Sequence, residues 1–160
     1  MTRFRPIHGV LLIGLLVLPV VGWALARELF PERFTGHERV EVDDRGVVRI
    51  DLADLEPQEV RFFRYLNYGN QEVRFFVGRD EGGTVQVAFD ANELCYKTKR
   101  GYHYQGDGWL VCRKCDKAFR LAEANAGGGG CNPVPLAHRL DGDTLVLQEG
   151  QILEGWRYFR

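Results

Sequence analysis

The chain has 160 residues, of which 45% are hydrophobic and 27% charged, and its formal net charge is -1 at pH 7. A nearly neutral chain lacks the positive charge that supplies most nucleic-acid affinity, so we expect no nucleic acid among its partners. Nineteen glycines against one methionine favour turns over long helices. The length leaves room for one soluble domain after an apolar start.

The N-terminal segment is a candidate membrane anchor. Residues 9–26 carry no charge, and as a helix they would reach about 27 Å, close to the ~30 Å of a bilayer core. Arg3 and Arg5 precede the segment, so the positive-inside rule predicts a cytoplasmic N-terminus and an extracytoplasmic, periplasmic remainder. Small residues at 24 and 26 also fit a signal-peptidase site, so cleavage stays open. We expect residues 1–26 to form a single-pass anchor in the cytoplasmic membrane or a signal segment.

Polar residues 27–38, which include a proline and a glycine, predict a tether. Beyond it, residues 39–160 alternate short apolar runs with glycine- and aspartate-rich turns, which predicts a mostly β domain. A half-buried strand is expected over 60–66, turned back at 67–70, and the single modest helix candidate is 118–126. Four hairpins are expected, at 40–42 with 47–50, 72–77 with 84–89, 102–104 with 109–111, and 136–140 with 144–147.

All four cysteines lie in one stretch, in the spacing Cys95-x16-Cys112-x2-Cys115-x15-Cys131. The Cys-x-x-Cys pair follows a strand-like Trp-Leu-Val run, which places two thiols on one tight turn, and the other two arrive from flanking loops. Four thiolates that converge describe a tetrahedral site for a soft metal such as zinc, or an iron–sulfur cluster. On spacing alone both remain open.

Two structural disulfides are the ordinary alternative in an exported protein. However, a bridge between Cys112 and Cys115 would close a strained ring, and a domain of this length can form a stable core without disulfide bonds. Thioredoxin-like chemistry would need a parallel-sheet pattern that is missing here, and Asp116 stands where covalent c-type haem requires a histidine. His103 and His138 lie near the cysteines in sequence, although a lone histidine is more often structural than a ligand.

Basic residues crowd this stretch. Between residues 95 and 120 there are two acids, Asp107 and Asp116, against seven bases: Lys97, Lys99, Arg100, Arg113, Lys114, Lys117 and Arg120. They form either a solvated face or a set of cations that balances the negative charge of a tetrathiolate centre. Both interpretations stay open.

Residues 109–147 resemble a Rieske-type domain, in which a Cys-x-His loop precedes a Cys-x-x-His loop, a proline-rich loop and a closing Gly-Asp hairpin. In this comparison Cys95 and Cys112 occupy the positions of the two Rieske cysteines, and Cys115 occupies the position of the second histidine. Lys97 occupies the position of the first histidine. The resemblance implies that Cys131, in the loop Gly130-Cys-Asn-Pro-Val-Pro-Leu136, replaces that missing ligand.

The lead Asp90-Ala-Asn-Glu-Leu-Cys-Tyr96 and the Gly-Gly-Cys-Asn-Pro run make residues 60–159 similar to the FtrD-like membrane iron–sulfur proteins, which accompany bacterial iron permeases. The resemblance implies a Rieske-like antiparallel β domain after one membrane helix. It implies an iron–sulfur cluster, [2Fe-2S], on Cys95, Cys112, Cys115 and Cys131, with zinc as the alternative.

The expected function is membrane-tethered electron transfer linked to iron uptake, with an iron permease or a redox protein as partner. No nucleophile–base pair or paired carboxylates indicate an enzyme.

Overall fold

The computed structural model describes residues 22, 36–126 and 130–160. The predicted anchor and most of the predicted tether therefore lie outside the described residues. No helix within the described part of the chain is long and apolar enough to cross a bilayer. Residues His37–Arg160 form one compact unit, which is described below.

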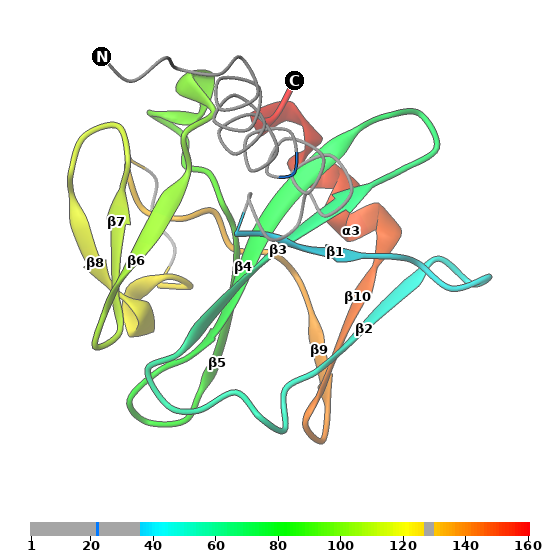
Figure 1. Cartoon of the computed structure of the whole chain (residues 1–160), viewed down its shortest axis with the longest axis horizontal. Coiled ribbons are helices and arrows are strands. Elements are labelled where there is room, and N and C mark those ends of the chain that lie inside the picture. The colour runs from blue at the N-terminus through cyan, green and yellow to red at the C-terminus, as the bar shows by residue number, and fades with distance from the viewer. Residues whose placement is uncertain (1–21, 23–35, 127–129) are drawn as a thin grey trace, which may run out of the picture. The chain divides into compact units, whose positions relative to one another are not determined.

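The described residues form three small sheets with few helical turns (Figure 1). The strands are β1 (Glu38–Val40), β2 (Val47–Asp51), β3 (Val60–Leu66), β4 (Glu72–Arg79), β5 (Val85–Phe89), β6 (Tyr102–Gly106), β7 (Trp109–Cys112), β8 (Ala118–Arg120), β9 (Arg139–Asp141) and β10 (Thr144–Gln148). The helical elements are η1 (Tyr96–Thr98), η2 (Leu121–Glu123), α3 (Glu149–Glu154) and η3 (Gly155–Tyr158). The strand orders are β1-β3-β4-β5, β2-β10-β9 and β6-β7-β8.

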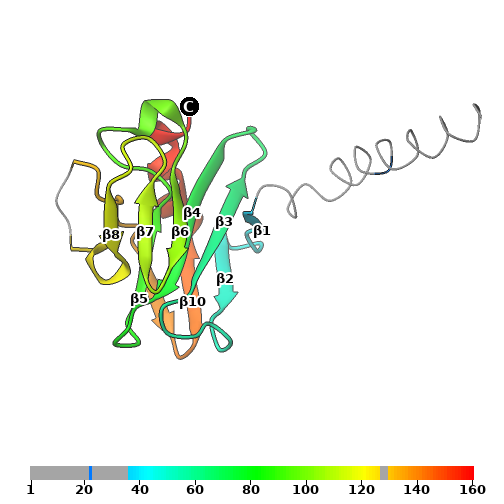
Figure 2. The ribbon, with the colours of Figure 1, turned by 60° about the vertical axis from the view of Figure 1, so that its left-hand side comes forward.

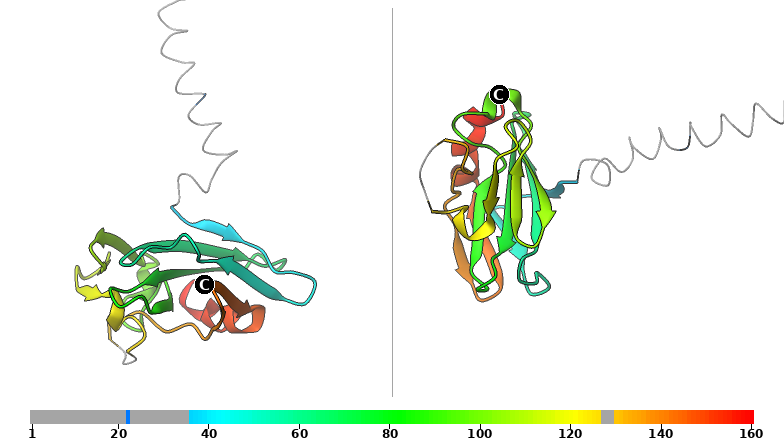
Figure 3. Two further views of the ribbon diagram at one scale, coloured as in Figure 1. Left: turned by 90° about the horizontal axis from the view of Figure 1, so that it is seen from below. Right: turned by 90° about the vertical axis from the view of Figure 1, so that its left-hand side faces the viewer.

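The first two sheets enclose the larger core. Seen from below, β3 and β4 lie across β10 and α3 (Figure 3), and the layer between them contains Phe63 and Phe75 with Leu145 and Ile152, all buried. The Phe63 and Phe75 rings stack with their centroids 5.4 Å apart. Burying each such side chain contributes about 1.5–3 kcal/mol, so this layer stabilises the fold.

β4 connects the larger core to a second core under the β6-β7-β8 sheet. Successive side chains of a strand point to opposite faces, so Phe75 enters the first core while Phe76 enters the second. The second core also holds Tyr102, Leu110 and Cys112, each at most 1% exposed. One of the predicted metal ligands is thus part of the packing that holds the small sheet in place.

Most predicted strand pairs are confirmed. β3 turns back into β4, and β4 pairs with β5, β6 with β7 and β9 with β10, all antiparallel. The turns are short and rich in glycine, asparagine or aspartate, which suits tight reversals. The prediction of a mostly β, antiparallel domain therefore holds for the described residues, with the exception described next.

The predicted hairpin of 40–42 with 47–50 is wrong. Its turn forms, because the Asp43 carboxylate accepts hydrogen bonds from the backbone N–H groups of Arg45 and Val47. The two strands nevertheless diverge: β1 pairs parallel with β3, and β2 pairs antiparallel with β10. Val48 and Ile50 reach the larger core through the β10 pairing, and this long-range burial outweighs the local closure of a hairpin.

The helix predicted over 118–126 is also wrong. Residues 118–120 form β8 against β7, with Phe119 opposite Leu110, and only residues 121–123 turn as a short 3-10 helix. Phe119 is buried between two exposed neighbours, which is the alternation of a strand. Tertiary packing has overridden a weak helix preference.

Candidate metal centre

The four cysteines come from three loops at one end of the domain. Cys95 precedes η1, Cys112 ends β7, Cys115 lies in the turn between β7 and β8, and Cys131 lies in the loop that leads towards β9. Figure 2 shows the β7–β8 turn and η1 side by side at the upper end of the domain. Residues up to 36 apart in sequence are thereby brought together.

Three of the four sulfur atoms are close enough to share a metal, and the fourth lies beside two of them. The Sγ atoms of Cys95, Cys112 and Cys115 all lie within 4.8 Å of one another. The Cys131 Sγ lies 3.7 Å from that of Cys95 and 3.3 Å from that of Cys115. All four thiols are free, and these separations exceed the ~2.05 Å of a disulfide.

A soft metal fits this donor set. Four sulfurs held about 2.3 Å from one ion lie roughly 3.8 Å apart, which is close to the observed distances. Thiolate sulfur is the ligand that zinc, iron and copper(I) prefer. The distances and the donor chemistry are therefore those of a soft-metal site built from cysteines.

Burial differs among the four cysteines. Cys112 is 1% exposed, Cys95 and Cys131 are half-buried, and Cys115 is exposed. Burial, helped by the neighbouring thiols, raises the pKa of Cys95 to about 12. A cation that binds this sulfur would therefore have to displace its proton.

The Cys-x-x-Cys turn is closed by the backbone. The Asp116 N–H donates to the Cys112 carbonyl at 2.9 Å, and the Cys112 N–H donates to the Lys117 carbonyl at 3.0 Å. Asp116 has a φ of 56°, a left-handed conformation that aspartate tolerates better than most residues. This turn presents Cys112 inward and Cys115 outward.

Asn92 ties the loops together. Its Oδ1 accepts hydrogen bonds from the backbone N–H groups of Cys95 at 2.6 Å and Leu94 at 3.1 Å. Its Nδ2 donates to the Tyr102 hydroxyl at 2.9 Å and to the Cys112 Sγ at 3.6 Å. With 2% exposure, this side chain holds Cys95 through its backbone N–H and Cys112 through its sulfur.

Tyr102 extends the same network. Its hydroxyl donates to the Cys131 carbonyl at 2.5 Å, and burial raises its pKa well above the usual range. Its backbone N–H donates to the buried Asp90 carboxylate at 2.6 Å, which also lies 3.2 Å from His37 Nε2. A Cβ at Gly101 would lie 2.2 Å from Asp90, and Gly101 has a φ of 64°, so only glycine fits beside this carboxylate.

The structural roles of Asn92 and Tyr102 are not visible in the sequence. In the sequence Asn92 is one residue of the lead before Cys95, and a buried polar partner has no periodic signal. The two histidines do not join the described thiol group. His103 lies half-buried on β6, and His138 donates from Nδ1 to the Leu136 carbonyl at 2.9 Å. Lys97 is exposed in η1.

Comparisons with known proteins give one match. The family described as "Membrane iron-sulfur containing protein FtrD-like" matches residues 55–159, a range that contains all four cysteines. No curated protein and no solved structure matches the chain. Because the family match covers well over half of the sequence, this chain belongs to the FtrD-like family of membrane iron–sulfur containing proteins.

Proposed function

We propose that this domain binds a [2Fe-2S] cluster through Cys95, Cys112, Cys115 and Cys131 and transfers electrons in support of iron uptake. The observation that carries the proposal is the close group of three free thiols, those of Cys95, Cys112 and Cys115, with the free thiol of Cys131 beside two of them. Membership of a membrane iron–sulfur family supports the choice of iron over other soft metals. An iron permease or a redox protein is the proposed partner.

A bound iron–sulfur cluster supplies a one-electron redox couple. The protein contributes a buried inner edge at Cys112 and an exposed outer edge at Cys115. It also contributes the Asn92 N–H directed at Cys112. In a Rieske centre two histidines raise the potential, so an all-cysteine centre in a Rieske-like domain should have a lower one.

A zinc-binding module is the second candidate. The short distances of 3.3 and 3.7 Å between sulfurs match the ligands of one tetrahedral ion. In a two-iron cluster, two thiols bind each iron, and the two pairs of thiols lie farther from each other. Zinc also binds more tightly than iron(II) to the same ligands. In this alternative the centre would serve structure or metal handling without a redox role.

Anaerobic purification of the full chain from an iron-replete host should separate the two candidates. We expect about two irons and two acid-labile sulfides per chain, with an EPR signal after reduction by dithionite. One zinc per chain without labile sulfide, under the same conditions, would replace electron transfer by the zinc-binding module.

We also propose the domain organisation: residues 1–26 as the anchor or signal segment, 27–38 as the tether and 39–160 as the Rieske-like domain on the periplasmic side. Alkaline phosphatase fused after Arg160 should be active, because the charge bias sends the C-terminus outward. A cytoplasmic reporter at the same point should be silent. The opposite pattern would show that the C-terminus is cytoplasmic. Separately, a mature chain that begins at Arg27 would indicate cleavage after residue 26.

A further inference from the structure

Six cations surround the exposed edge of the thiol group. Three follow Cys95 along the chain and three flank Cys115 in the β7–β8 turn; they are Lys97, Lys99, Arg100, Arg113, Lys114 and Lys117. All six are exposed, and Asp116 is the single acid on these two segments. We call these six residues, together with Cys115 and Leu94, the cationic face.

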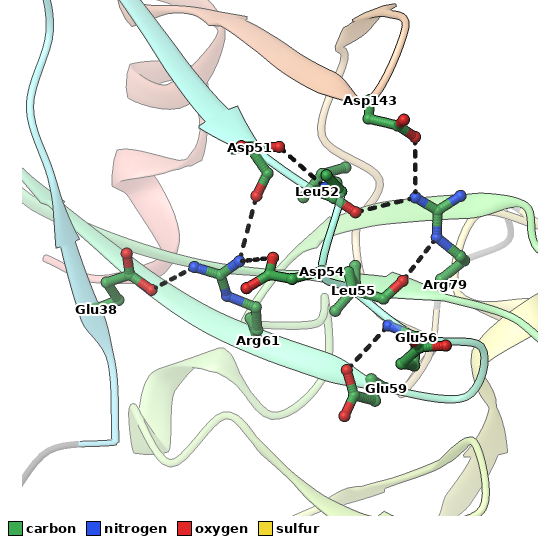
Figure 4. A network of polar contacts seen from close by, with 11 residues as sticks. Glu38, Asp51, Leu52, Asp54, Leu55, Glu56, Glu59, Arg61, Arg79 and Asp143 are labelled. Atoms are coloured by element: carbon green, nitrogen blue, oxygen red, sulfur yellow. Dashed lines mark hydrogen bonds and ion pairs between the residues drawn. The ribbon is translucent and has the colours of Figure 1, made fainter.

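None of the six cations forms an ion pair among the described residues. Elsewhere in the described chain seven arginines each have a carboxylate within 4.0 Å; they are Arg39, Arg49, Arg61, Arg74, Arg79, Arg139 and Arg157. Figure 4 shows two of them, Arg61 with Glu38 and Asp54 and Arg79 with Asp143, in a region where acids accompany every cation drawn. Positive charge is therefore left uncompensated at the thiol end of the domain.

The cationic face also offers an apolar contact and an exposed thiol. Leu94 is 69% exposed beside Cys95, although large aliphatic side chains are usually covered. Protein interfaces combine apolar anchors with complementary charge, which steers the encounter and fixes the orientation. Cys115 lies within the second cationic segment and is exposed, so a protein bound here would contact the centre directly.

We propose that the cationic face docks an acidic redox protein and that one electron passes between this partner and the centre at the Cys115 edge. The proposal deepens, and rests on, the proposed electron-transfer function. The member that donates is oxidised by one electron and the other is reduced by one, with no bond or proton transferred. The exposed thiol within the face favours a redox protein over an anionic lipid surface, which has no use for that ligand.

Docking can be tested without a cluster. The full chain in phosphatidylcholine nanodiscs should bind fluorescent poly-L-glutamate, used as a probe of an acidic surface, and the binding should weaken as salt rises. The double variant Lys97→Glu and Lys114→Glu should raise the dissociation constant about tenfold at low salt. The matched control, Arg45→Glu with Arg139→Glu, has the same change in net charge away from the face and should change it less than about twofold.

If both double variants lose the same affinity for poly-L-glutamate, binding depends on net charge alone and the proposal is overturned. Phosphatidylglycerol vesicles serve as the lipid arm. Tighter binding to these vesicles than to poly-L-glutamate, with the same dependence on Lys97 and Lys114, would assign the cationic face to a membrane surface and also overturn it.

The electron route needs a second readout. After reduction, the protein should be oxidised faster by hexacyanoferrate(III), an anion, than by hexaammineruthenium(III), a cation. In the Lys97/Lys114 variant this rate ratio should fall about tenfold, with the control variant unchanged. An unchanged ratio in both variants would exclude electron exit at this face. A protein with no reducible chromophore would instead contradict the proposed function, while the poly-L-glutamate result would still decide docking.

Discussion

Replacing Cys112 by serine should remove most of the bound metal. A hydroxyl does not ionise as a thiol does, and three ligands leave the tetrahedral site open. Cys112 is 1% exposed, so water cannot easily take the vacant position. We expect metal affinity to fall by at least about 100-fold, beyond the range seen when only a supporting residue is lost. Iron, zinc and acid-labile sulfide per chain are the measurements.

Serine at Cys95, Cys115 or Cys131 should also release most of the metal, with the smallest loss at the exposed Cys115. The matched control is Leu110→Ala, which removes a fully buried neighbour in the same strand. It should cost about 2–5 kcal/mol of stability and leave the metal stoichiometry intact. Full metal content in three of the four serine variants would refute the tetrathiolate site.

Replacing Asn92 by leucine should have the next largest effect. The variant removes the acceptor for the Cys95 and Leu94 N–H groups and the donor to Cys112 Sγ. The Cys95 N–H would lose its partner, at a cost of about 1–3 kcal/mol, whereas the Leu94 N–H keeps the Gly130 carbonyl at 3.3 Å. Metal affinity should fall about 10–100-fold, as for other residues that orient ligands. Loss of a hydrogen bond to a ligand sulfur should also lower the reduction potential.

Two further variants separate a positioning role from general destabilisation. Tyr102→Phe removes the hydroxyl that donates to the Cys131 carbonyl and keeps the ring, so its effect should be smaller than that of Asn92→Leu. Gln86→Leu removes a buried hydrogen bond to Asp80 outside the thiol network, and it should reduce stability without moving the potential. If Asn92→Leu leaves both potential and metal content unchanged, Asn92 does not position the ligands.

Local sequence features determined most of the neighbouring strand pairs and the class of metal ligand. The turns of the β4–β5, β6–β7 and β9–β10 hairpins are short and contain residues that favour tight reversals, so neighbouring strands pair without information from distant residues. The class of metal could also be predicted from the sequence, because four cysteines in one stretch favour soft metals in any fold. The resemblance to the FtrD-like family rested on these same motifs, and the family match bears it out.

Tertiary structure alone decided the rest. The turn at Asp43 forms as its sequence predicts, yet β1 and β2 join different sheets, because their partners β3 and β10 are chosen by burial against distant residues. Residues 118–120 become a strand for the same reason. The links from Asn92 to Cys112 and from Tyr102 to Cys131 span 20 and 29 residues. The uncompensated charge of the cationic face likewise emerges only when folding pairs seven other arginines with acids and leaves these six cations without an ion pair among the described residues.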